Sequence, residues 1–215
     1  MKRLVLTIAA LIISAACFNA NAEGVVVKGG FNYTHLDLTQ SIKDQAKALA
    51  IGARNFSGFH ASIGYQTEEF GGFTLQPEFR FLSNKGNAFG EGNTWSLNYL
   101  ELPVNIQWGI DLVALRPFIQ LSPYLGYNIR NTLRESKSTS EPARQFLKNV
   151  TTYTGRFSYG IGIGGGIELM RKFQITAQYV WNFGQVVNAK QYIDNATNVS
   201  RDTAAGLEIS LGLLF

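Results

Sequence analysis

The last nine residues of the sequence, 207–215, alternate in a way that constrains the fold of the whole chain. Residues of one parity are all apolar: Leu207, Ile209, Leu211, Leu213 and Phe215. The other parity is small or polar, with Leu214 as the exception. A period of two is typical of a β-strand with one apolar face. Because a free apolar edge strand templates aggregation in water, this ending favours a closed barrel in a membrane, which has no free edge.

The N-terminal residues have the three parts of a secretory signal peptide. A positively charged start is followed by an apolar run over 4–17, and Ala22 ends a small-x-small cleavage motif. The apolar run is too short to cross a bilayer as a helix. We therefore predict a signal peptide over 1–22 and a single barrel domain over 23–215. Lipoprotein processing at Cys17 is the alternative, and the residues before this cysteine do not complete a lipobox.

The charge of the chain excludes one large class of partner. The formal net charge is +4, and removing Lys2 and Arg3 with the leader leaves 17 basic against 15 acidic residues, or +2. This balance carries no nucleic-acid signature. Beyond the leader, no apolar run reaches the roughly 18 residues that a membrane-spanning helix needs. Any crossing of a membrane must therefore use strands.

The rest of the sequence predicts a barrel of eight strands. Eight segments alternate with period two: 25–36, 58–66, 73–82, 95–108, 118–130, 157–169, 173–183 and 207–215. The connections after the second, fourth and sixth segments are short, and those after the other segments are long. This is the pattern of outer-membrane barrels, with short periplasmic turns, long extracellular loops and periplasmic termini. The predicted fold is all-β, an eight-stranded antiparallel up-and-down transmembrane β-barrel in the bacterial outer membrane.

The fourth segment changes phase. Its apolar residues share one parity over 95–99 and the other parity over 100–108. One extra residue re-aims every side chain that follows, so we expect a bulge near Tyr99. Pro103 and Pro123 lie inside the fourth and fifth segments. Because proline lacks a ladder donor, each is expected to mark a bulge or a kink.

A soluble, lipocalin-like barrel shows the same alternation with its faces reversed, so the polar residues must decide which face is outside. Water-facing surfaces are usually rich in Lys and Glu. Here only Lys28 of the mature lysines lies inside a predicted strand. The apolar parity carries aromatic residues at both ends of the strands, which resembles the two aromatic girdles of membrane barrels: Tyr65, Trp108, Phe173 and Phe215 at one end, and Phe59, Tyr127 and Trp181 at the other. The apolar face is therefore predicted to face lipid.

Two segments carry a family resemblance. Residues 99–108 read YLELPVNIQW, and residues 116–127 read RPFIQLSPYLGY. They resemble the outer-membrane β-barrel family common in Bacteroidetes, which includes PorT-like proteins. The resemblance implies an eight-stranded outer-membrane barrel, and it transfers no site residues. The terminal strand also resembles the one by which such barrels are recognised for assembly, which implies that Phe215 is an assembly signal read by the barrel assembly machinery.

Five charged residues have the parity of the lumen: Glu78, Arg80, Glu101, Glu168 and Glu208. Buried charges must be paired, so we predict a structural charge network that includes a pair between Arg80 and at least one of the glutamates. We expect Lys28, Arg130 or Arg156 to complete it, or one of the acids to be protonated. An eight-stranded barrel has an interior only just wide enough for side chains to fill, so no continuous water path is expected. A gated ion path is the alternative interpretation.

Two other patterns suggest chemistry and are better explained by structure. Residues 160–165 spell GxGxxG, but a dinucleotide site needs a strand before this motif and a helix after it, and here the strand alternation continues through the motif. His35 and His60 are the only histidines, and they have opposite parities. The sequence therefore predicts no enzyme, no catalytic or metal-binding residues and no cofactor.

The predicted function is a structural or binding role in the outer membrane. A small, porin-like diffusion channel is one alternative, and an accessory subunit of a secretion or adhesion complex is another. Expected partners are outer-membrane lipid and lipopolysaccharide, the latter through the basic connection 131–155, and an unidentified protein remains a further candidate. Partner co-purification would separate the accessory subunit from the other two.

Overall fold

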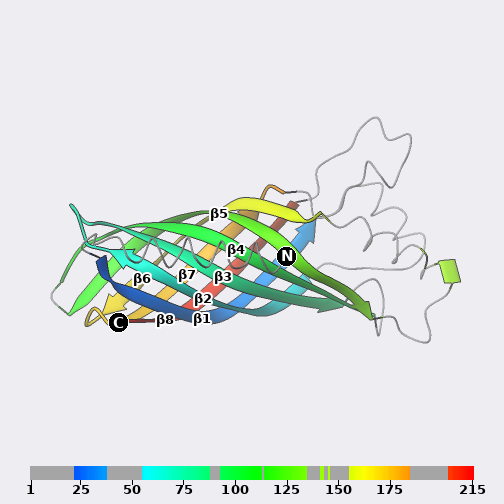
Figure 1. The fold of residues 1–215 in the computed structure, drawn as a ribbon, viewed down its shortest axis with the longest axis horizontal. Coiled ribbons are helices and arrows are strands. Elements are labelled where there is room, and N and C mark those ends of the chain that lie inside the picture. The colour runs from blue at the N-terminus through cyan, green and yellow to red at the C-terminus, as the bar shows by residue number, and fades with distance from the viewer. Residues whose placement is uncertain are drawn as a thin grey trace, which may run out of the picture.

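The computed structural model describes residues 22–37, 55–87, 93–112, 114–134, 141–142, 145, 155–184 and 203–215. Its eight strands form one closed antiparallel barrel in chain order, which confirms the predicted fold class (Figure 1). The strands are β1 (Ala22–Asp37), β2 (Asn55–Thr67), β3 (Phe73–Asn87), β4 (Thr94–Gly109), β5 (Leu115–Arg134), β6 (Phe157–Leu169), β7 (Phe173–Asn182) and β8 (Thr203–Leu214). Several strands run further than the alternation predicted, so Lys85 lies in β3 and not in a connection. Residues 1–21 of the predicted leader and most of the basic connection 131–155 lie outside the described residues, and Ala22, the last residue of that leader, is the first residue of β1.

The C-terminal strand closes the barrel. It pairs with β7 on one side and with β1 on the other, from Val26 opposite Leu214 to Asp37 opposite Thr203. Phe215 continues the ladder, because its backbone N–H donates to the carbonyl of Val25 at 2.9 Å and its carbonyl accepts from Val25 N at 3.1 Å. Both edges of the apolar terminal strand are therefore paired, as a strand in a membrane requires.

The two ends of the barrel differ. At the turn end, the short connections 68–72, 110–114 and 170–172 join consecutive strands, and the C terminus lies at this same end (Figure 1). The tightest connection places Met170 and Arg171 at positive φ, 53° and 55°. Lys172 N donates to the carbonyl of Leu169 at 3.0 Å across this turn. Two successive positive φ angles define the turn whose twist matches that of the flanking strands. We call the opposite end of the barrel the loop end.

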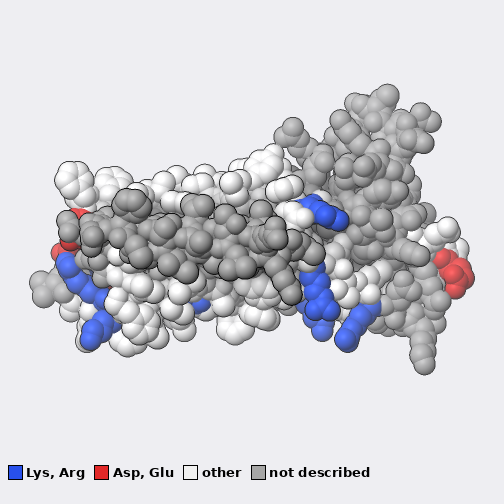
Figure 2. Space-filling view, in the orientation of Figure 1, with Lys and Arg blue, Asp and Glu red and all other residues white. Residues whose placement is uncertain are grey.

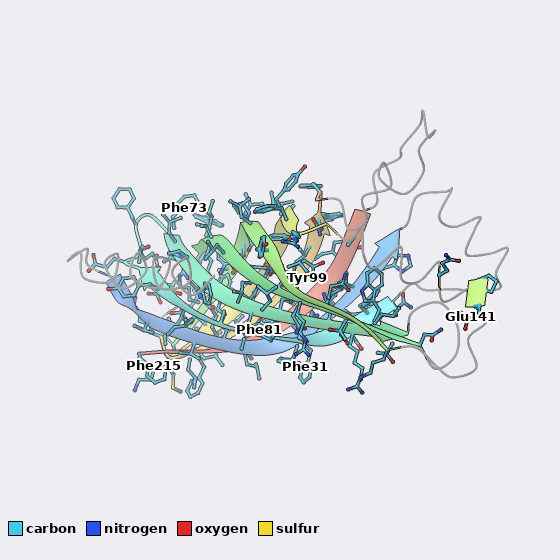
Figure 3. The ribbon with its side chains drawn as sticks, turned by 45° about the vertical axis from the view of Figure 1, so that its right-hand side comes forward. Phe31, Phe73, Phe81, Tyr99, Glu141 and Phe215 are labelled. Carbon is cyan, nitrogen blue, oxygen red and sulfur yellow. The ribbon has the colours of Figure 1, made fainter. Side chains whose placement is uncertain are left out.

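The outer face is apolar. Large side chains of the predicted outer parity are exposed along every strand, among them Phe31 (78%) and Phe73 (53%). Phe31, Phe73 and Phe215 lie on the outside of the barrel, whereas Tyr99 lies within it (Figure 3). On the visible wall, described charged residues gather towards the two ends of the barrel (Figure 2). The predicted assignment of the two faces is confirmed for these residues.

The predicted change of phase in β4 is wrong. Burial alternates without interruption through this strand, so Trp95, Leu97 and Tyr99 face the interior together with Glu101 and Gln107. Trp95 is fully buried and packs edge-on against the ring of Phe56 on β2, with ring centroids 5.6 Å apart. The loop end of the lumen is therefore lined by apolar side chains, which the sequence pattern alone places on the lipid face.

A bulge does lie at this level, but in the neighbouring strand. Asn98 pairs with Arg130, whereas Tyr99 pairs with Asn128, so Ile129 is the extra residue and belongs to β5. A bulge disturbs the strand that carries it and leaves the partner regular. The side chains of β4 therefore keep their alternation, and the apolar residues in its first half, Trp95, Leu97 and Tyr99, stay inside the barrel.

The two strand prolines leave the register unchanged. Pro103 pairs with Tyr124, and three positions further along the ladder Ile106 pairs with Leu121. Pro123 lies in an uninterrupted run of pairs with β6. The register therefore contains no bulge at either proline, because a proline removes one ladder donor without inserting a residue, and the alternative of a kink stays a prediction.

Candidate functional site in the barrel lumen

Arg80 is the centre of the first charge cluster. It projects from β3 and contacts Glu101 on β4, with Nε–Oε2 at 2.8 Å and Nη2–Oε2 at 2.7 Å. Its Nη1 reaches Glu208 Oε2 on β8 at 2.7 Å, and Gln178 Nε2 donates to the same oxygen at 2.7 Å. In the closed strand order β8 lies three strands from β3. The planar guanidinium presents several donors at once, so a single arginine holds two carboxylates across the lumen.

Glu78 is the centre of a second cluster. Lys28 Nζ lies 2.9 Å from its Oε1, and the amides of Gln76 and Asn105 donate to the same oxygen at 2.9 and 2.6 Å. Ser62 Oγ donates to its Oε2 at 2.6 Å. Four donors from four strands therefore hold this carboxylate, which meets the requirement that a buried charge be paired and hydrogen-bonded. Lys28 takes the role that the sequence left open among three cations.

Glu168 lies in a third cluster, near the turn end. Gln66 Nε2 donates to its Oε2 at 3.0 Å. Arg116 Nη1 lies 3.8 Å from the same oxygen, and Arg116 Nε donates to Glu69 Oε2 at 3.0 Å. Arg116 was missed from the sequence because the predicted fifth segment began at residue 118. Its parity matches that of Gln120, and this is the signal that would have found it.

The buried charges of the described lumen do not balance. Its buried cations are Lys28, Arg80 and Arg116, and its buried carboxylates are Glu78, Glu101, Glu168 and Glu208. Arg130 and Arg156, the other cations considered from the sequence, are exposed. Because Arg80 serves two glutamates, ionisation of both leaves one negative charge uncompensated in its cluster.

Side-chain amides fill the middle of the lumen. Gln107 Nε2 donates to Gln76 and Gln120 at 2.8 and 3.0 Å, and Gln120 Nε2 donates to Gln178 at 3.0 Å. A cavity of about 10 Å³ remains beside Lys28 and Arg80. One water needs roughly 10–15 Å³ of such space, so this cavity holds at most a single molecule. The described side chains leave no water-filled channel at this level.

The glycines of β6 accommodate large neighbours. Cβ atoms added at Gly160 and Gly166 would lie 2.7 Å from the rings of Tyr124 and Phe118. A Cβ at Gly164 would collide with the backbone of β7. The side chains that fill this glycine stripe come from the adjacent strands β5 and β7, because a residue directly opposite in the ladder lies nearest to the missing side chain.

A second cavity, of about 50 Å³, lies towards the loop end. We call it the loop-end cavity. Its apolar wall is formed by Phe56, Leu82, Leu97, Tyr99, Tyr124 and Val180. Glu101, Glu208 and Ser158 also line it, so the cavity borders the Arg80 cluster directly. An apolar wall with a few convergent polar groups is the usual composition of a small-molecule site.

The two histidines are not brought together. His60 is buried and its Nε2 lies 2.8 Å from Ser210 Oγ of β8. This contact passes over Gly30, where a Cβ would lie 2.6 Å from the imidazole nitrogen. His35 is exposed on the outer face, with Nδ1 2.9 Å from Asn55 Oδ1. The stretch 160–165 stays within β6.

In the part of the chain that the structure describes, no helix is long and apolar enough to cross a membrane. The His, Cys, Asp and Glu residues of the same part form no group of three or more that could hold a metal ion.

A closed barrel with an apolar exterior and a polar, filled interior is a transmembrane β-barrel. Residues 20–188 match the family described as outer membrane protein beta-barrel domain, and the chain belongs to this family. Membership agrees with the predicted location in the bacterial outer membrane. The match concerns the broad family, and the narrower PorT-like kinship stays a prediction.

Solved outer-membrane barrels resemble the chain over most of its length. Neisserial surface protein A (NspA) is 14% identical, with 90% of this chain and 99% of that chain covered and a TM-score of 0.49. OprG from Pseudomonas aeruginosa is 10% identical, with 91% and 97% covered and a TM-score of 0.46. Ail, the attachment invasion locus protein of Yersinia pestis, is 11% identical, with 90% and 99% covered and a TM-score of 0.41. At these values the likenesses carry no argument about activity or ligand. A search of curated protein sequences finds no match.

Proposed function

We propose that this protein is a non-enzymatic outer-membrane barrel with a structural or binding role and a lumen closed by its own side chains. The observation that carries the proposal is that polar bonds cross the lumen at two levels. Arg80 joins β3 to Glu208 of β8, and Gln66 joins β2 to Glu168 of β6. Because the interior of an eight-stranded barrel is narrow, two such crossings are enough to interrupt a water path.

The same proposal includes an orientation and partners. The turn end, which carries the C terminus, is assigned to the periplasm and the loop end to the cell exterior, following the general build of such barrels. Lipid contacts the outer apolar face, and lipopolysaccharide contacts the basic connection 131–155. Phe215 serves as the signal for the barrel assembly machinery. Labelling of single cysteines at Arg171 and Asn55 in intact cells tests the orientation, because only the second is expected to react.

The other two candidate functions receive less support. A diffusion channel requires the cross-lumen bonds of Arg80 and Gln66 to open, at the cost of leaving buried carboxylates unpaired. The accessory-subunit role rests on the PorT-like resemblance alone.

Solute flux into liposomes tests the closed lumen. Proteoliposomes that contain the folded protein are expected to swell in glycine or arabinose no faster than protein-free liposomes. A large porin reconstituted in parallel serves as the positive control. Swelling that increases with the amount of folded protein would reject the closed lumen and favour the diffusion channel.

A further inference from the structure

We propose that the loop-end cavity is a binding site for a small organic cation, such as a primary ammonium group that carries a short apolar chain. This inference deepens the proposed binding role and rests on it. It does not depend on whether the lumen conducts. Three independent features of the cavity support it: a charge, a wall and an unpaired hydroxyl group.

The charge lies at the border between the cavity and the Arg80 cluster. Glu101 and Glu208 both line the cavity, and both bind the single guanidinium of Arg80 through their Oε2 atoms. Lys28 is engaged by Glu78, and Arg116 contacts Glu69 and Glu168. One negative charge is therefore left beside the cavity when both glutamates are ionised. A buried charge is costly unless it is compensated, and the compensating charge is either a proton or a bound cation.

The wall of the cavity suits an organic cation better than a hydrated inorganic one. Phe56, Leu82 and Leu97 supply aliphatic and aromatic surface that a hydrated metal ion would not contact favourably. Tyr124 also lines the cavity, and its ring centroid lies 6.0 Å from the guanidinium carbon of Arg80. Aromatic faces attract ammonium groups, most strongly where water is excluded.

The hydroxyl group of Ser158 is the third feature. Ser158 is only 6% exposed and lines the cavity, and among the described residues its Oγ has no hydrogen-bond partner. It faces Gly126 across the ladder, beside Glu101, whose Oε1 would lie 3.5 Å from a Cβ at position 126. An unmade hydrogen bond on a buried group costs free energy, and an ammonium donor would supply it. The absence of a side chain at Gly126 makes space for this hydroxyl itself, because a Cβ there would collide with Ser158 Oγ.

The volume limits the size of the ligand. A cavity of about 50 Å³ accommodates a few non-hydrogen atoms. This matches a short alkylammonium ion and excludes a nucleotide, a sugar or a peptide. The ligand class is therefore a small amine with an apolar tail.

Isothermal titration calorimetry on the folded protein in detergent micelles tests the site. The probes are butylammonium, butanol and butyrate, which share an apolar chain and differ in charge. Butylammonium is expected to bind saturably, butanol roughly tenfold to a hundredfold more weakly, and butyrate not at all. Equal affinity for butylammonium and butanol, or no saturable binding of butylammonium, would overturn the proposal.

Three variants locate the binding. Glu208→Gln leaves a neutral pair between Arg80 and Glu101 and is expected to weaken butylammonium binding roughly tenfold to a hundredfold. Ala204→Leu fills the cavity, which Ala204 lines, and is expected to abolish binding with the charges intact. Glu69→Gln, at the turn end, is the matched control and is expected to bind as the wild type does. Equal affinities of Glu208→Gln and Glu69→Gln would contradict the site.

Conductance and amine binding can fail separately. If the barrel conducts but still binds butylammonium, the closed lumen is rejected and the binding site is supported. If the barrel does not conduct and binds no butylammonium, only the binding site is rejected. Each variant is first shown to be folded by its heat-modifiable mobility on gels, so that loss of binding is not loss of fold.

Discussion

Gln66 and Glu168 are joined by a hydrogen bond of 3.0 Å between Nε2 and Oε2, although they belong to β2 and β6, which lie diametrically opposite in the closed strand order. Both side chains are almost completely buried. The two side chains, joined by this one bond, therefore span the whole width of the lumen near the turn end. Together with the crossing from Arg80 to Glu208, it makes the middle and the turn end of the lumen a packed polar core.

Removal of Arg80 should destabilise the barrel strongly. Arg80→Ala leaves Glu101 and Glu208 buried without their common cation, and the expected loss is about 3–5 kcal/mol of unfolding free energy. Arg130→Ala, at an exposed position on β5, is the matched control and should change stability little. Urea titration of the folded protein in lipid vesicles measures both. A loss no larger for Arg80→Ala than for the control would show that the cluster is not a structural element.

The two carboxylates explain that loss, and a further variant tests the explanation. Arg80→Met combined with Glu101→Gln and Glu208→Gln removes all three charges together. Replacing a complete buried charge cluster is often close to neutral, whereas breaking it is costly. The triple variant should therefore be more stable than Arg80→Ala alone. The opposite order would mean that the size of Arg80, and not its charge, matters.

The lipid-facing side of β7 is tested at Ala177, which is exposed midway along the strand. Ala177→Arg should cost about 2–4 kcal/mol, the penalty for arginine near the bilayer midplane. Ala177→Leu is the matched control and should be neutral or stabilising. Gln178→Arg places the charge beside Glu208 in the lumen and should cost less than Ala177→Arg. Equal losses at the two neighbouring positions would mean that the faces are assigned wrongly.

The glycines of β6 should differ in their tolerance of alanine. A Cβ at Gly164 would collide with the carbonyl oxygen of Ala177, which belongs to the backbone. A Cβ at Gly162 would meet side chains and no backbone atom: the end of Gln178 at 2.9 Å and the Cβ of Ser122 at 3.3 Å. We expect Gly164→Ala to cost on the order of 1–3 kcal/mol and Gly162→Ala clearly less. Unfolding in urea compares them, and the reverse order would contradict the packing described here.

The outer face of the barrel was predictable because lipid demands apolar side chains at the outward positions that it contacts. Phe31 and Ile209, for example, have the predicted outward parity and are exposed. The same rule does not forbid apolar residues inside. Trp95, Leu97 and Tyr99 fill the loop end of the lumen, so the alternation in β4 was interpreted with the wrong phase.

The lumen was predictable in composition and not in its pairings. Parity alone identified Arg80 and its glutamates as inward-facing, and burial of charge required them to pair. Which carboxylates Arg80 reaches depends on strand stagger and on side-chain length, neither of which is visible in the alternation. The bulge at Ile129 and the contact of Gln66 with Glu168 also depend on how the strands are staggered when the barrel closes. The alternation of the sequence therefore does not predict them.

The location in the bacterial outer membrane agrees with the family match and with the paired terminal strand. The folded protein is expected to fractionate with outer membranes and to run faster on gels when it is not heated, because a closed barrel stays compact in detergent. The boiled sample is the control for the unfolded chain. Recovery as a soluble periplasmic protein would contradict the membrane barrel.

Single-channel recording in planar bilayers tests the closed lumen most directly. Purified wild-type protein, shown to be folded and inserted, is expected to give no steady ohmic current, because the bonds from Arg80 to Glu208 and from Gln66 to Glu168 close the interior at two levels. The Arg80→Ala variant is recorded in parallel, since loss of one crossing should allow transient openings. Steady ohmic conductance of the wild-type protein, unchanged by the conditions of refolding, would contradict the account and identify the barrel as a channel.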